Sequence, residues 1–163
     1  MNESVRVAPA YDGFPIDFPA LIRLFVIGIV TGALGWLLYL AISNYFIVPV
    51  FCRSADAFAV CSNGGTIAWL SGHIIALFVA VAVAARAAVY RPLLIAIAVL
   101  ATLWSAHAWL GVLPWYMGLL WQMALFGIAF AAYGWLARAA NFMVVLIVTL
   151  ALIVLSRLVL LWA

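Results

Sequence analysis

The chain has 163 residues, of which 72% are hydrophobic and only 7% are charged, with a net charge of +3 and a mean hydropathy of +1.36. A soluble domain has about 25% charged residues, so this composition excludes a water-exposed globule and places the chain in a lipid bilayer. All 7 basic residues are arginine and form no basic stripe, which excludes nucleic acid as a partner. The 4 acidic residues lie outside the apolar segments, which excludes paired-carboxylate catalysis within the membrane.

The polar N-terminal segment, residues 1–20, is expected to be retained and to lie at the membrane interface. It lacks the pattern of a cleaved signal, and Pro15 and Pro19 oppose a long helix. Five apolar segments follow, and each is predicted to be a helix because backbone polar groups in lipid must be satisfied within the segment. Their predicted boundaries are 21–47, 66–89, 93–112, 115–136 and 142–162. The sequence therefore predicts an all-α membrane protein, with one five-helix transmembrane domain over residues 21–163.

Arginine placement predicts how this bundle is oriented. Arginine is enriched in cytoplasmic loops, and a cytoplasmic N-terminus puts most of the arginines inside. The inner group is then Arg6, Arg23, Arg86, Arg91 and Arg138, and the outer group is Arg53 and Arg157. We therefore expect a cytoplasmic N-terminus, an extracytoplasmic C-terminus and residence as a multi-pass protein of a bacterial inner membrane.

Both cysteines, Cys52 and Cys61, fall in the longest predicted loop, residues 50–65, which this orientation places outside the cytoplasm. An oxidising compartment favours a disulfide between them, and closing such a ring contributes about 2–3 kcal/mol through loop entropy. A redox-active pair is the alternative, but such pairs usually have the CxxC spacing, which this chain lacks. The sequence favours a structural disulfide.

Small residues recur at every fourth position along one face of the second predicted helix. These positions are Ala68, Gly72, Ala76, Ala80, Ala84 and Ala88. Gly28 and Gly32 form a shorter pair of the same kind in the first helix. Small residues let helices approach closely in lipid, so both patterns predict packing surfaces within the bundle, with a homo-oligomer interface as the alternative.

The strongly polar side chains within the predicted spans all fall in the outer halves of the helices, about 5–11 Å below the outer surface. Deep aromatic residues share this layer, which predicts an outward-facing polar and aromatic pocket. Its candidate ligand-binding residues are Asn44, His73, Trp104, His107, Trp121, Gln122 and Arg157. Arg157 either extends to lipid head groups or presents a fixed positive charge to an anionic group.

Three functions fit such a pocket. The leading hypothesis is a binding or accessory component of an envelope complex that holds an anionic amphiphile and contacts lipid, a membrane-protein partner or a second copy. The first alternative is a transporter or flippase component for a small solute or lipid head group. The second is a redox protein in which His73 and His107 ligate haem b, or in which His107 and Trp104 hold a quinone. No catalytic residue is predicted, because no carboxylate lies in a span to orient a base.

Overall fold

The computed structural model describes residues 18–52, 61–87, 89, 91–104, 106–139 and 142–162. All regular secondary structure in these ranges is helical, and they contain no strand. The all-α class predicted from the sequence is therefore confirmed. The predicted interfacial segment 1–20 lies outside the described residues except for Phe18 to Ala20, which begin the first helix.

Within the described ranges, three helices are long and apolar enough to cross a membrane. They are the continuous stretch Phe18–Phe51, α3 (Gly64–Arg86) and the part Trp115–Ala137 of α6 (Trp115–Ala139). The first stretch consists of α1 (Phe18–Ile42) and a π-helical continuation, η1 (Ser43–Phe51). Pro49 lies within η1 and has no N–H, so it cannot make the backbone hydrogen bond that would continue an α-helix at its position.

The third predicted segment, 93–112, is divided into two helices, α4 (Pro92–Leu103) and α5 (Ala106–Leu110). The imidazole Nδ1 of His107 donates to the carbonyl of Trp104 at 3.1 Å, so a side chain satisfies a carbonyl at the break. Neither helix alone has the roughly 20 residues that a membrane crossing needs. The structure thus differs from the single continuous helix predicted here.

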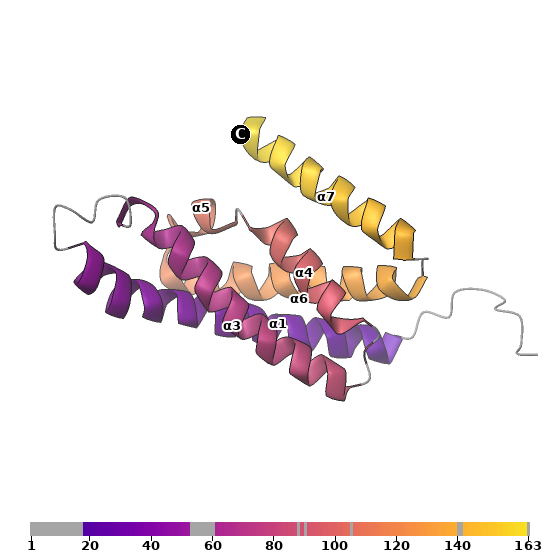
Figure 1. The fold of residues 1–163 in the computed structure, drawn as a ribbon. Coiled ribbons are helices and arrows are strands. Elements are labelled where there is room, and N and C mark those ends of the chain that lie inside the picture. The colour runs from indigo at the N-terminus through magenta and orange to yellow at the C-terminus, as the bar shows by residue number, and fades with distance from the viewer. Residues whose placement is uncertain are drawn as a thin grey trace, which may run out of the picture.

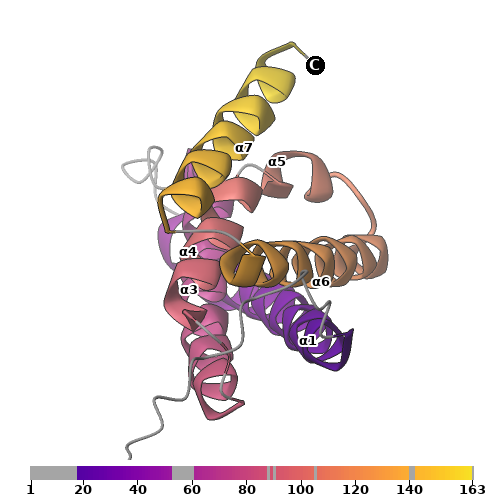
Figure 2. The ribbon, with the colours of Figure 1, turned by 90° about the vertical axis from the view of Figure 1, so that its right-hand side faces the viewer.

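The last helix, α7 (Phe142–Trp162), has the boundaries predicted from the sequence. It packs mainly against α4, with a smaller contact to α6, from which it continues after a short connection. Figures 1 and 2 show that α7 leans away from the other long helices and that its C-terminal end stands clear of them. Most of its described side chains are exposed.

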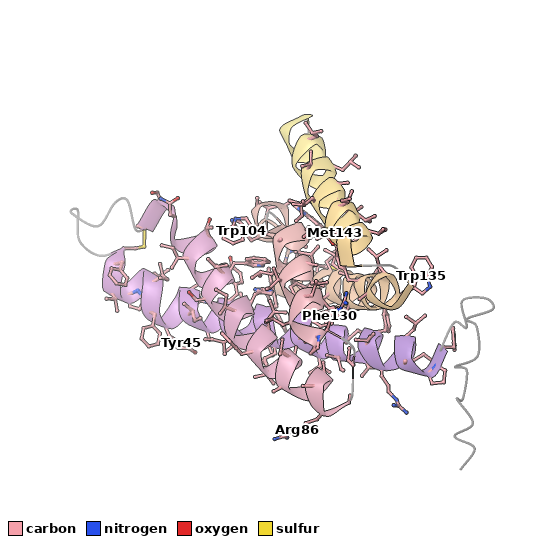
Figure 3. The ribbon with its side chains drawn as sticks, turned by 45° about the vertical axis from the view of Figure 1, so that its right-hand side comes forward. Tyr45, Arg86, Trp104, Phe130, Trp135 and Met143 are labelled. Atoms are coloured by element: carbon pink, nitrogen blue, oxygen red, sulfur yellow. A yellow bond between two sulfur atoms is a disulfide. The ribbon has the colours of Figure 1, made fainter. Side chains whose placement is uncertain are left out.

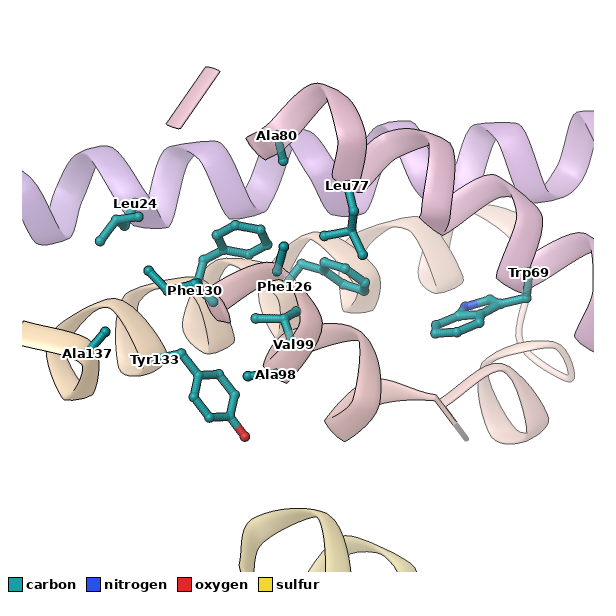
Figure 4. Close-up of a cluster of buried hydrophobic side chains, with 12 residues drawn as sticks. Leu24, Trp69, Leu77, Ala80, Ala98, Val99, Phe126, Phe130, Tyr133 and Ala137 are labelled. Carbon is teal, nitrogen blue, oxygen red and sulfur yellow. The ribbon is translucent and has the colours of Figure 1, made fainter. Parts of the chain in front are cut away.

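The core of the molecule is built around α1, α3 and α6, and α4 adds Ile95, Ala96, Ala98 and Val99 to the same buried cluster. α1 lies between α3 and α6 and packs along both, and both run opposite to it (Figure 1). Leu24 from α1, Leu77 from α3, and Phe126 and Phe130 from α6 fill its centre and are buried (Figure 4). α4 covers α6, and its Thr102 hydroxyl lies 2.6 Å from the Tyr133 hydroxyl of α6.

Glycines allow the three core helices to approach one another at backbone distance. A Cβ atom added at Gly28 would lie 2.5 Å from the carbonyl oxygen of Phe126 on α6. One added at Gly72 on α3 would lie 2.8 Å from the amide nitrogen of Tyr39 on α1. The neighbouring atoms are backbone and cannot swing aside. The described members of the small-residue face on α3 are all buried, namely Ala68, Gly72, Ala76, Ala80 and Ala84, and Ala88 lies outside the described residues.

Cys52 and Cys61 form a disulfide, as the sequence predicted, with their Cα atoms 5.2 Å apart. The bond joins the end of η1 to the residues just before α3, across a loop of which residues 53–60 lie outside the described part. In Figure 3 the disulfide and Arg86 lie toward opposite ends of α3. We call these the disulfide end and the arginine end of the molecule.

Candidate functional site

His73 is the centre of a polar group in the core. It lies on α3, is 0% exposed, and faces Gly35 of α1. A Cβ atom added at Gly35 would lie 2.7 Å from Nε2 of the imidazole, so the missing side chain on α1 is what makes room for this ring. On the α6 side, the amide Nε2 of Gln122 lies 3.2 Å from the same imidazole nitrogen, and Gln122 is also 0% exposed.

Hydrogen bonding determines the tautomer of His73. Its Nδ1 lies 2.8 Å from the carbonyl oxygen of Trp69, which only accepts, so Nδ1 carries the proton. The partner at Nε2 is the amide nitrogen of Gln122, which only donates, so Nε2 is the acceptor and the imidazole is neutral. This arrangement has the NH₂ group of Gln122 facing His73 and the amide oxygen turned elsewhere.

Four rings from three helices form a continuous series around His73. Phe126 of α6 lies 5.0 Å from it between centroids, and Trp69 of α3 stacks on it at 4.2 Å. The indole of Trp69 then lies 5.8 Å from the ring of His107 on α5. At the far side, Nε2 of His107 lies 3.0 Å from the hydroxyl of Thr66. We call Thr66, Trp69, His73, His107 and Gln122 the histidine cluster.

Two polar atoms of the histidine cluster are buried without a hydrogen-bond partner, the indole Nε1 of Trp69 and the amide Oε1 of Gln122. Both side chains are almost fully enclosed, at 1% and 0% exposed. An unmet buried donor or acceptor costs about 1–3 kcal/mol. The cluster therefore offers one N–H donor and one C=O acceptor to anything that can reach it.

The structure gathers only part of the pocket predicted from the sequence. His73, His107 and Gln122 belong to the histidine cluster. Trp104 and Trp121 are 37% and 48% exposed, and Trp121 instead pairs edge to face with Trp109 at 6.1 Å. Asn44 is exposed on η1. Arg157 lies on α7, but its side chain is outside the described part of the structure.

Three contributors were absent from the sequence-based list: Thr66, Trp69 and Gly35. Trp69 lies four residues before His73, and Thr66 lies three residues before Trp69, so helical periodicity alone places all three on neighbouring parts of one face of α3. That spacing could have identified the two residues on α3. No local signal could have paired Gly35 with His73, because the contact depends on how α1 and α3 are rotated against each other.

The two histidines do not fit the predicted haem site. Axial ligation needs a free imidazole nitrogen on each side of the iron. In this structure Nε2 of His73 faces Gln122, Nε2 of His107 faces Thr66, and both Nδ1 atoms face carbonyl oxygens. The indole of Trp69 contacts both imidazoles and lies between them. Among the residues with described positions, no group of three potential metal ligands occurs either.

The structure does not form the quinone site expected from the sequence, in which the Trp104 indole lies beside His107. The backbone carbonyl of Trp104 accepts a hydrogen bond from His107, whereas the indole that contacts the His107 ring belongs to Trp69. A quinone oxygen could accept from Nε1 of Trp69, but a quinone has no hydrogen to donate to Oε1 of Gln122.

No family model, curated protein or solved structure matches this chain.

Proposed function

We propose that this chain is a small multi-pass membrane protein that acts as an accessory or binding component of a membrane complex. The observation that carries the proposal is the contrast in packing between α7 and the core helices. α1 is covered on two sides by α3 and α6, whereas α7 contacts the rest of the chain mainly through α4. Its position in Figures 1 and 2 leaves most of its length open to another protein.

The residues of α7 suit a partner helix rather than a small ligand. Its exposed side chains are aliphatic or methionine, and include Met143, Ile147, Leu150, Val154, Leu155 and Leu158. Helices associate in lipid through close van der Waals packing, which such a face can supply. The accessory role therefore needs no chemistry beyond the described surface, and it is not an enzymatic role.

The proposed topology has five crossings, with α4 and α5 together forming the third and α7 the fifth. Arg23, Arg86 and Arg91 lie at the arginine end, near the start of α1, the end of α3 and the start of α4. Because positive residues concentrate on the cytoplasmic side and disulfides form on the oxidising side, the arginine end is assigned to the cytoplasm. This orientation, in a bacterial inner membrane, puts the C-terminus outside.

Labelling of single cysteines tests the topology. In a chain with Cys52→Ser and Cys61→Ser, we place one cysteine by Asn63→Cys or by Ala87→Cys. An impermeant maleimide added to intact spheroplasts should label position 63, and position 87 only after the membrane is opened. Labelling of position 87 alone in intact spheroplasts would reverse the orientation.

Native electrophoresis of membranes solubilised in mild detergent tests the accessory role. Ile147→Trp and Val154→Trp enlarge the open face of α7 without adding charge, and they should shift the protein from a discrete large complex to its monomer. Ile128→Trp, at an exposed position of α6, is the matched control and should leave the complex intact. Monomer mobility of the unchanged protein would contradict the proposal.

The break between α4 and α5 favours one second candidate, a transporter or flippase component. Interrupted helices in membranes occur where the backbone is buried in protein or lines a substrate path, and transporters use them for binding. Against this candidate, His73 and Gln122 fill the core at this level and are closely packed by Gly35 and Phe126. Uptake of labelled solutes or lipids by reconstituted vesicles would distinguish transport from an accessory role.

Of the two roles open to Arg157, this proposal takes the second, in which its fixed positive charge binds an anionic group. An Arg157→Leu variant should still insert, since it removes a charge from a transmembrane helix. It should lose retention of an acidic phospholipid through purification, measured by lipid extraction and mass spectrometry. Equal retention by the variant would mean that Arg157 only extends to the membrane surface.

A further inference from the structure

The unmet hydrogen-bonding atoms of the histidine cluster define what a ligand there would need. The tautomer of His73 is set by the carbonyl of Trp69, which in turn sets the amide of Gln122. Turning that amide over would bring its oxygen against the lone pair of His73 Nε2, so Oε1 of Gln122 cannot be satisfied by rotation. The site therefore presents an acceptor in Gln122 and a donor in Trp69 at the same time.

This pairing selects a neutral head group. An ionised carboxylate could accept from Trp69, but it has no hydrogen for Oε1 of Gln122. The neutral state of His73 also removes one source of positive charge from the cluster. A hydroxyl group both accepts and donates, so it satisfies the chemistry of both atoms.

The surroundings of the cluster select an apolar body for the same ligand. Phe126 and the ring face of Trp69 border His73, and the core helices are long and apolar enough to cross a membrane. A molecule arriving from the bilayer would carry a hydrocarbon chain and bring its hydroxyl to the cluster.

α5 borders the histidine cluster through His107. This helix has only five residues, and it follows a break and precedes the turn at Gly111. Its attachment to the start of α3 includes the hydrogen bond between His107 and Thr66 and the ring contact between His107 and Trp69. α5 is also held by Ala106 and Leu110, which are buried in a cluster with Trp36 of α1, so uncovering Trp69 requires α5 to separate from this contact while α1, α3 and α6 stay packed on one another.

We propose that the histidine cluster is a binding site for a neutral lipid alcohol, which enters under α5 and forms hydrogen bonds with Nε1 of Trp69 and Oε1 of Gln122. This ligand is distinct from the anionic amphiphile assigned to Arg157. It also needs no partner protein, so the site does not depend on the accessory role of α7.

Three chain-matched probes test the proposal on the full-length protein in lipid nanodiscs. The probes are 1-decanol, which has a donor and an acceptor, methyl decyl ether, which has only an acceptor, and decane, which has neither. A ligand that binds the folded state raises the midpoint of thermal unfolding, and near saturation the rise should be about 5 °C. Decanol should give the largest rise, the ether a smaller one and decane none.

Two variants assign the effect to the cluster. Trp69→Phe keeps an aromatic ring and removes the N–H, and Gln122→Met keeps a similar volume and removes the amide. Both should reduce the decanol effect, whereas only Trp69→Phe should reduce the ether effect. Trp135→Phe, at an exposed indole near the arginine end of α6, controls for loss of a tryptophan and should respond as the unchanged protein does.

The crossed response to the two probes distinguishes a site from a general effect on the membrane. Equal decanol effects in the unchanged protein, Trp69→Phe and Gln122→Met would overturn the proposal, since decanol would then act through the bilayer. Absence of any decanol effect on the unchanged protein would also overturn the proposal. Trapped water would then be the hydrogen-bond partner of Nε1 of Trp69 and Oε1 of Gln122. If one cluster variant fails to fold, the other decides by the same comparison.

Discussion

The core of α1, α3 and α6 and the last helix, α7, are all built from strongly apolar sequence but pack in different ways. In the core, glycine faces bring backbone within contact of backbone, as at Gly28 with Phe126 and at Gly72 with Tyr39. In α7 the described side chains are mostly large and aliphatic, and most of them are exposed. Apolar composition is enough to put a helix in lipid, but small residues at the right spacing are what hold it to its neighbours.

The largest effect should come from filling the closest contact in the core. Gly72→Leu would force a side chain into the backbone of α1 near Tyr39, and we expect a loss of about 3 kcal/mol in the free energy of unfolding, or failure to fold. Ala151→Leu makes a similar change on an exposed position of α7 and should cost less than about 0.5 kcal/mol. Thermal unfolding in detergent measures both, and equal losses would remove the distinction between core and α7.

The disulfide should have the next largest effect. Cys52→Ser with Cys61→Ser frees the end of η1 from the start of α3, and the expected loss is about 2–3 kcal/mol from loop entropy. Unfolding in denaturant with and without a reductant provides the measurement, and alkylation of the intact protein provides the control for pairing. Free thiols in protein from an oxidising compartment would show that the pair does not form there.

The hydrogen bond between His73 and Gln122 should contribute less than the packing around it. A double-mutant cycle with His73→Leu and Gln122→Leu should give a coupling of about 1 kcal/mol, in the range of polar contacts between membrane helices. A second cycle, with His73→Leu and Thr149→Val on α7, should be additive within about 0.3 kcal/mol. A coupling near zero in the first cycle would mean that shape alone holds α3 to α6.

The smallest expected change in the free energy of unfolding comes from replacing one threonine in each region. The Thr31 hydroxyl of α1 donates to the carbonyl of Ile27 at 2.6 Å, whereas the hydroxyl of Thr149 on α7 is buried without a partner. Thr31→Val should therefore cost about 0.5–1 kcal/mol, and Thr149→Val should be neutral or slightly stabilising. The same unfolding assay applies, and the reverse order would show that Thr149 is hydrogen-bonded in the membrane.

Depth along a helix was predictable from the sequence, but direction around its axis was not. The rise per residue places His73, His107 and Gln122 at similar depth, and the structure brings all three into one cluster. Trp121 was predicted beside them on the same reasoning, yet it faces away from the core although it adjoins Gln122 in sequence. Neighbouring residues on a helix point about 100° apart, and only the packing of α6 against α1 decides which of them is buried.

Breaks within apolar segments were also beyond the sequence. Segment 93–112 has the composition of one helix, yet it is divided into α4 and α5, and the carbonyl of Trp104 beside the division accepts a hydrogen bond from the His107 side chain. Whether a histidine side chain donates to a nearby backbone carbonyl depends on which other hydrogen-bond partners surround its ring. For His107 that partner is Thr66 at the start of another helix, forty-one residues away in sequence.

Local chemistry determined the lipid environment, the helical class, the disulfide and the small-residue face of α3 from the sequence alone. Each depends on composition or on residues close together in the chain, which obey the same rules wherever the helices end up. The tertiary structure decided which helices pack closely, that His73 meets Gln122 and Gly35, and that α7 is left largely uncovered. These outcomes depend on how each helix is rotated about its axis, which is set by the fit of all its neighbours at once.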